Sequence, residues 1–112
     1  MIRKISLRPY NGTLYYASTV DDYHKAHMKY FSHCPPDELT DAQCGRFFGG
    51  EGKDGYWAYL VWASKPCYLA HEMAHVVFHV FDRCGLDPSD SGGEAFCYLL
   101  SQLLSDCETN NG

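Results

Sequence analysis

Five consecutive residues near the middle of the chain have the residue types of a metal-dependent hydrolytic site. They read His71-Glu72-Met73-Ala74-His75, with the two histidines four positions apart. On an α-helix, residues at this spacing share one face, so both imidazoles can reach one cation. Glu72 projects beside the pair, where a carboxylate can hydrogen-bond a metal-bound water and take its proton. The pattern therefore predicts two nitrogen ligands and an adjacent general base on one helix.

The residues around this motif are mostly apolar. Tyr68-Leu69-Ala70 precede it and Val76-Val77-Phe78 follow it, within one predicted helix. A dry apolar wall strengthens the polarisation of water by a bound zinc ion. A catalytic zinc ion takes three protein ligands and keeps one position open. We therefore expect Zn²⁺ as the cofactor and a third ligand from elsewhere in the chain. The alternative is that both histidines are ordinary core or surface residues.

Glu94 is the candidate for the third ligand. Eighteen residues separate it from His75, and it lies in the predicted first turn of the next helix, after the flexible pair Gly92-Gly93. An HExxH motif followed at this distance by Glu94-Ala95 resembles the gluzincin group of zincin metallopeptidases, whose second helix delivers a glutamate ligand. The pattern is also similar to small zincin-like proteins encoded by bacteriophages. The resemblance covers residues 56–104.

This resemblance implies a role for each residue of the pattern. His71, His75 and Glu94 would bind zinc, and Glu72 would be the general base when a zinc-bound water hydrolyses a peptide or protein substrate. The implied fold is a minimal zincin-like α+β domain. In that fold a small, mostly antiparallel sheet packs on the HExxH helix, and the glutamate helix follows.

One position departs from the pattern of the thermolysin-like gluzincins. They carry an Asp four residues after the glutamate ligand, where this chain has Tyr98. Asp82, Asp90 or a backbone carbonyl would then orient a ligand histidine. Tyr98 and His79 are candidates for stabilising an oxyanion, and ordinary structural packing is the alternative for both.

Two other ligand sets involve neighbouring residues. His79 extends the row of histidines, but the helical rise places it about 6 Å beyond His75 along the axis, so the two are not expected to share one tetrahedral ion with His71. A closed structural zinc site would need a fourth ligand, and Cys97, one turn after Glu94, is the nearby candidate.

The elements that must position the motif follow the order β-β-α-β-β-α-α, which indicates an α+β domain. Periodicity and turn residues define their limits. We expect strands over residues 2–7, 13–17, 46–48 and 56–62, a helix between Thr19 and Pro35, a polar loop over 34–44, and helices over 65–84 and 93–107.

Turn and capping residues support this order. Asn11-Gly12 predicts a hairpin turn, and residues 49–55 predict another, glycine-rich hairpin rather than a phosphate-binding loop. Ser64 is expected to cap the HExxH helix, with Pro66 in its first turn and Gly85 at its end. Asp90 or Ser91 is expected to cap the last helix.

Length, composition and charge limit the number of domains and the classes of binding partner. The 112 residues predict one domain over 1–112 with a frayed tail over 108–112. A net charge of −5 with scattered Lys and Arg argues against nucleic acid, and no apolar run approaches the roughly 20 residues that span a bilayer. No apolar stretch follows the charged N-terminus, so we expect no signal peptide and a cytoplasmic protein.

The expected absence of a signal peptide also bears on the six cysteines. We expect reduced thiols, with Cys67, Cys84 and Cys97 behaving as small buried hydrophobes within apolar helical patterns.

The small size of the chain keeps a second function open, a non-hydrolytic zincin-fold binding module such as a phage anti-defence or host-takeover inhibitor. The sequence does not define the oligomeric state.

Overall fold

A single four-stranded sheet forms the centre of the molecule, with strand order β1-β2-β4-β3. The structure is a computed structural model that describes residues 1–35, 39 and 43–108. Strand β2 pairs in parallel with β4, whereas the β1–β2 and β3–β4 pairs are antiparallel. The strands are β1 (Ile2–Ser6), β2 (Thr13–Ala17), β3 (Gly45–Glu51) and β4 (Trp57–Ala63). The sheet is therefore mostly antiparallel, as predicted.

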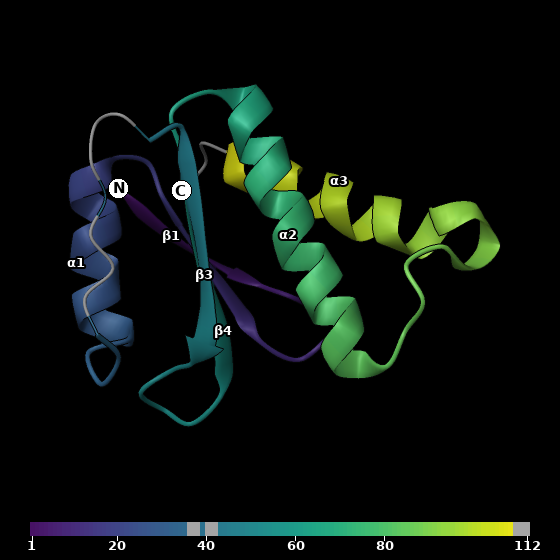
Figure 1. Cartoon of the computed structure of the whole chain (residues 1–112), viewed down its shortest axis with the longest axis horizontal. Coiled ribbons are helices and arrows are strands. Elements are labelled where there is room, and N and C mark those ends of the chain that lie inside the picture. Colours follow the sequence, from purple (N-terminus) through teal and green to yellow (C-terminus); the bar gives the residue numbers. More distant parts are fainter. Residues whose placement is uncertain (36–38, 40–42, 109–112) are drawn as a thin grey trace.

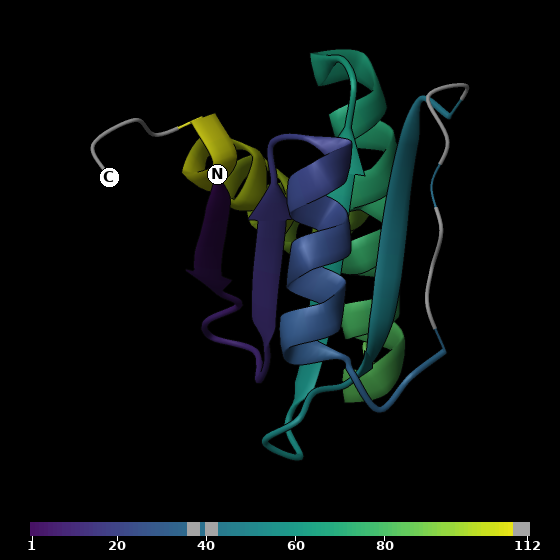
Figure 2. The same cartoon turned by 90° about the vertical axis from the view of Figure 1, so that its left-hand side faces the viewer.

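Helices cover both faces of this sheet. Helix α1 (Val20–Tyr30) lies on one face, and α2 (Pro66–Cys84) and α3 (Glu94–Glu108) lie on the other (Figures 1 and 2). The predicted α+β class and element order are confirmed. No helix in the described part of the chain is long and apolar enough to cross a membrane.

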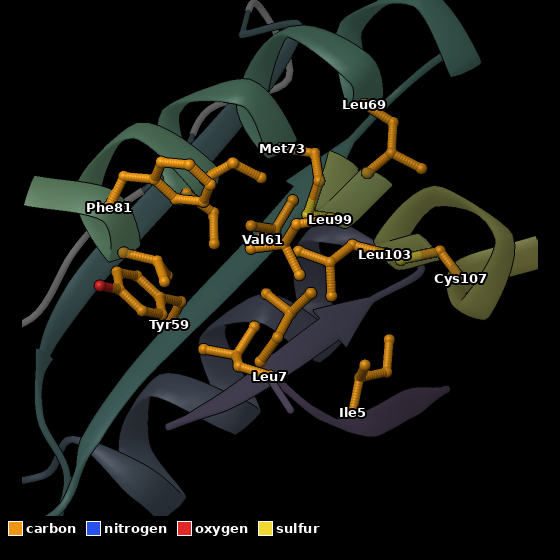
Figure 3. Packing of buried hydrophobic residues seen from close by; sticks show 14 residues of the cluster. Ile5, Leu7, Tyr59, Val61, Leu69, Met73, Phe81, Leu99, Leu103 and Cys107 are labelled. Carbon is orange, nitrogen blue, oxygen red and sulfur yellow. The ribbon is translucent and has the colours of Figure 1, made fainter. Parts of the chain in front are cut away.

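Strand β4 is buried on both sides because it lies inside the sheet and between helices. Tyr59 and Val61 point toward α2 and α3, whereas Leu60 and Trp62 point toward α1. Figure 3 shows the first of these cores, where Val61 lies among apolar side chains of α2 and α3. Burial of these side chains fixes α2 against the sheet and so fixes the orientation of the HExxH motif.

Strand β3 is one of the two edge strands of the sheet, and its side chains alternate between the two cores. Phe47 packs on the α2 side. Phe48 packs on the α1 side, with its ring centroid 5.0 Å from that of Phe31. The predicted hairpin is confirmed, but β3 is longer than expected because its pairing with β4 continues through Gly49, Gly50 and Glu51.

Thr19 and Gly85 cap their helices as predicted, whereas the predicted cap at Ser64 is wrong. Thr19 accepts a 3.0 Å bond from the Asp22 backbone N–H at the start of α1, and Gly85 ends α2 in the left-handed region at φ 70°. Ser64 does not cap α2. Its backbone N–H and its hydroxyl both donate to the carbonyl oxygen of Cys44, at 2.8 and 3.0 Å. This pairing ties the start of β3 to the end of β4.

The connection between α2 and α3 also differs from the prediction. Neither Asp90 nor Ser91 caps the last helix directly, because residues 90–93 form a separate 3₁₀ turn with φ of 55° at Ser91, 72° at Gly92 and 81° at Gly93. Helix α3 then begins at Glu94 and crosses behind α2 (Figure 1).

Two other predictions concern the limits of the described chain. Glu108 belongs to α3 rather than to a frayed tail, and residues 109–112 lie outside the described residues. Of the predicted loop over 34–44, residues 36–38 and 40–42 also lie outside them.

All six cysteines are free, but the expected burial of three of them is wrong. Cys67, Cys84 and Cys97 are exposed, whereas Cys107 is buried. Their apolar neighbours in the sequence point toward the sheet, while these three positions fall on the outer faces of α2 and α3.

Candidate metal centre

The structure brings the two histidines of the motif together on α2. The Nε2 atoms of His71 and His75 lie 3.3 Å apart, with ring planes inclined by 83°. Two Zn–N bonds of about 2.05 Å at a tetrahedral angle place their nitrogens about 3.3 Å apart. The pair therefore has the spacing of two ligands on one tetrahedral zinc ion.

Glu72 lies beside this pair and is turned toward the sheet. Its Oε2 is 3.9 Å from His71 Nε2, and its side chain is 15% exposed while that of His71 is 67% exposed. The carboxylate therefore stands next to the nitrogen pair but has much less access to solvent. This is the arrangement expected of a base that acts on a group held by the histidines.

A cavity of about 480 Å³ opens beside Glu72, between the first turns of α2 and the start of β3. Its lining is formed by Gln43, Cys44, Gly45, Cys67, Tyr68, His71 and Glu72. A hydrogen bond with the Cys44 thiol raises the pKa of Tyr68, and the charges of Cys44 and Cys67 add to the effect. Tyr68 therefore remains a neutral phenol at neutral pH.

Strand β3 supports the second histidine. The ring of Phe47 stacks on His75 with centroids 5.5 Å apart and planes inclined by 11°. Because β3 is held by β4 and α2, Phe47 limits the rotation of the His75 imidazole.

His79 is held by the core and does not join the pair. Its Nδ1 is 2.7 Å from the hydroxyl of Tyr59, and its ring stacks on Trp57 with centroids 5.6 Å apart. Burial raises the pKa of Tyr59, so this hydroxyl keeps its proton. The geometry favours the packing alternative for His79 over a role as ligand or oxyanion group.

The structure does not bring Glu94 to the histidine pair. Helix α3 begins far from the N-terminal half of α2 (Figure 1), and Phe96 packs on Phe78 and Phe81 of the C-terminal half at centroid distances of 4.6 and 5.8 Å. Within residues 1–35, 39 and 43–108, no three His, Cys, Asp or Glu side chains are grouped to hold a metal ion. The same finding gives no support for a closed site with Cys97.

The remaining predicted site residues lie elsewhere. Tyr98 is exposed and lines a separate cavity of about 370 Å³ with Arg8 and Tyr10. Asp82 is exposed in the last turn of α2, about 10 Å from His75 along the helix axis. Asp90 is exposed in the 3₁₀ turn.

Sequence reasoning missed the contribution of the edge strand. Gly45 lies against Glu72 and Phe47 lies against His75, two residues apart on the same side of β3. The alternation of a strand was the available signal, but the sequence did not show which face of β3 meets α2.

No family model, curated protein or solved structure matches this chain.

Proposed function

We propose that this protein is a zinc-dependent hydrolase of peptide bonds, in which His71 and His75 are the two metal ligands that the described residues bring together and Glu72 is the general base. The 3.3 Å separation of the two Nε2 atoms carries the proposal, because it matches two ligands of a tetrahedral zinc ion. The partly buried carboxylate of Glu72, 3.9 Å from His71 Nε2, adds the second component of a hydrolytic site.

A bound zinc ion would supply a Lewis acid that lowers the pKa of a water molecule to about 7. The transfer of protons and the positioning of the ligands depend on the protein's own side chains. Glu72 accepts a proton from the attacking water at Oε2 and delivers it to the leaving amine. Phe47 keeps the His75 ring in place during these steps.

The proposed substrate is an extended peptide segment. Strand β3 is at the edge of the sheet and runs past both Glu72 and His75. An edge strand offers backbone N–H and C=O groups to which an extended peptide can add as a further strand. The cavity beside Glu72 then provides space for a substrate side chain.

The experiment combines metal loading with removal of the base. Wild-type protein loaded with one equivalent of Zn²⁺ should cleave dye-labelled casein, and the activity should disappear with a chelator. Glu72→Gln should retain zinc and its melting temperature but lose at least about 100-fold in turnover, since it keeps the size of the side chain and removes its basicity. Glu51→Gln, at the exposed far end of β3, is the matched control and should keep full activity.

A non-hydrolytic binding module is the second candidate. It is favoured by the lack of a third ligand for the histidine pair in the described part of the chain. In this case Glu72→Gln would bind the target protein as tightly as wild type. Full activity of Glu72→Gln in any assay would contradict hydrolysis and favour the binding module.

A further inference from the structure

The Glu72 side chain packs against a residue that has no side chain of its own. A Cβ atom built on Gly45 would lie 2.9 Å from Glu72 Cγ and 3.3 Å from its Oε2. Real Cβ atoms essentially never come within 3.0 Å of another heavy atom. Any side chain at position 45 must therefore displace Glu72 or the strand.

The strand is not free to move away. The carbonyl oxygen of Cys44 accepts two hydrogen bonds from Ser64, and Gly45 pairs with Ala63 at the end of β4. A Cβ at position 45 would also lie 3.2 Å from the carbonyl oxygen of Trp62 on the neighbouring strand. The more movable neighbour is the Glu72 side chain.

Backbone conformation does not explain the glycine. Gly12, Gly55, Gly85, Gly92 and Gly93 have positive φ, but Gly45 does not and follows ordinary strand geometry. Glycine inside a strand costs conformational entropy and contributes no side-chain packing. The structural reason for a glycine here is space: a Cβ would collide first with the Glu72 side chain, at 2.9 Å, and would also crowd the Trp62 carbonyl oxygen, at 3.2 Å.

The geometry points to Gly45 as a positioning residue, which holds the Glu72 carboxylate beside His71 by leaving room for it at the start of the edge strand. This inference rests on the proposed function, because it assigns the purpose of the contact to the general base of that site. With Phe47 against His75, the same side of β3 then supports both the base and one ligand.

A double-mutant cycle in urea denaturation tests the contact itself. Gly45→Ala should raise the unfolding equilibrium constant roughly tenfold in the wild-type background, because it overpacks the site. In the Glu72→Ala background the same change should raise it less than about threefold, since the displaced side chain is absent. Gly50→Ala, whose Cβ would meet nothing closer than 3.5 Å, is the control for replacing glycine in β3.

A second measurement separates positioning from stability. With one equivalent of Zn²⁺, Gly45→Ala should bind the metal as wild type does, because both histidines are untouched. Its turnover of dye-labelled casein should fall roughly tenfold or more through kcat, with KM little changed, while Gly50→Ala stays at the wild-type rate.

Each outcome decides the inference. An equal effect of Gly45→Ala in both backgrounds overturns it, as does unchanged turnover of Gly45→Ala in an active enzyme. If Gly45→Ala does not fold, recovery of folding by Glu72→Ala supports the inference, and failure in both backgrounds counts against it. The wild-type protein could also neither bind zinc nor cleave casein while the double-mutant cycle still shows coupling between positions 45 and 72. That result would refute the proposed function and the role of Gly45 in it. It would leave the contact between the two residues established.

Discussion

The imidazole of His75 lies nearly parallel to the ring of Phe47, with the centroids 5.5 Å apart and the planes inclined by 11°. One metal-ligand candidate on a helix is thus oriented by an aromatic residue of the edge strand. This contact joins the two elements between which the proposed site lies.

Replacement of Phe47 should therefore weaken metal binding. We expect Phe47→Leu to reduce zinc affinity roughly tenfold, because residues that orient a ligand histidine contribute this much to metal binding. Competition with a chromophoric chelator measures the affinity. Phe48→Leu is the control, since Phe48 packs with Phe31 and His27 on the other side of the sheet and its loss should affect stability alone. Equal affinities of the Phe47→Leu and wild-type proteins would contradict the orienting role.

The hydrogen bond between Tyr59 and His79 should stabilise the fold without supporting the metal. Tyr59→Phe leaves His79 Nδ1 without its 2.7 Å partner and should lower the free energy of unfolding by about 1–2 kcal/mol. Zinc stoichiometry should stay unchanged, as metal analysis after dialysis would show. Tyr56→Phe, on an exposed tyrosine, should have no effect on either quantity. Loss of zinc in Tyr59→Phe would instead implicate His79 in the site.

Replacement of Glu94 tests the ligand assignment suggested by the sequence. In the arrangement described, Glu94→Gln should change zinc affinity less than about twofold, whereas His75→Ala should lose most of it. Isothermal titration with Zn²⁺ compares the two variants. If Glu94→Gln were as damaging as His75→Ala, α3 would have to move toward the N-terminal half of α2 when metal binds.

Stability should fall at alkaline pH because of Cys107. Burial raises the pKa of this thiol to about 12 from its usual 9.0. Between these values the unfolded chain loses the proton and the folded protein keeps it, so stability is complete below pH 9 and decreases as pH rises toward 12. The contribution amounts to about 1.4 kcal/mol per pH unit.

Urea denaturation between pH 8 and 11 measures this effect. Cys107→Ala should show a flatter decline than wild type, although it is less stable at pH 8. Cys97→Ser, on an exposed thiol, should follow the wild-type slope. Parallel curves for Cys107→Ala and wild type would assign the alkaline loss to other groups.

Local patterns predicted the elements well because each one is determined by nearby residues. Pro66 and Gly85 delimit α2 as expected, and the i, i+4 spacing does bring His71 and His75 together. These features depend on helical geometry alone.

Features that depend on contacts distant in the sequence were not predictable in the same way. Ser64 has the residue type of a cap, but the carbonyl of Cys44, twenty residues away, takes its hydrogen bonds. The eighteen residues between His75 and Glu94 are enough for Glu94 to reach a metal ion held by the two histidines. However, positive φ at Ser91 and at the glycines that follow turns the chain so that α3 begins near the C-terminal half of α2. The role of Gly45 depends on the pairing of β3 with β4.

The alternation of Phe47 and Phe48 between two cores limits how this chain can change in length. A one-residue insertion between Gly45 and Phe47 would reverse the facing of every residue on one side of it, removing either the glycine from Glu72 or the aromatic ring from His75. The turn after Glu51 has no such restriction of register, because both strands of the hairpin are already paired before it begins, although the Lys53 N–H donates to the Tyr30 carbonyl oxygen at the end of α1. One-residue insertions should therefore be tolerated between Asp54 and Gly55, at the exposed tip of the β3–β4 hairpin, and rejected within β3.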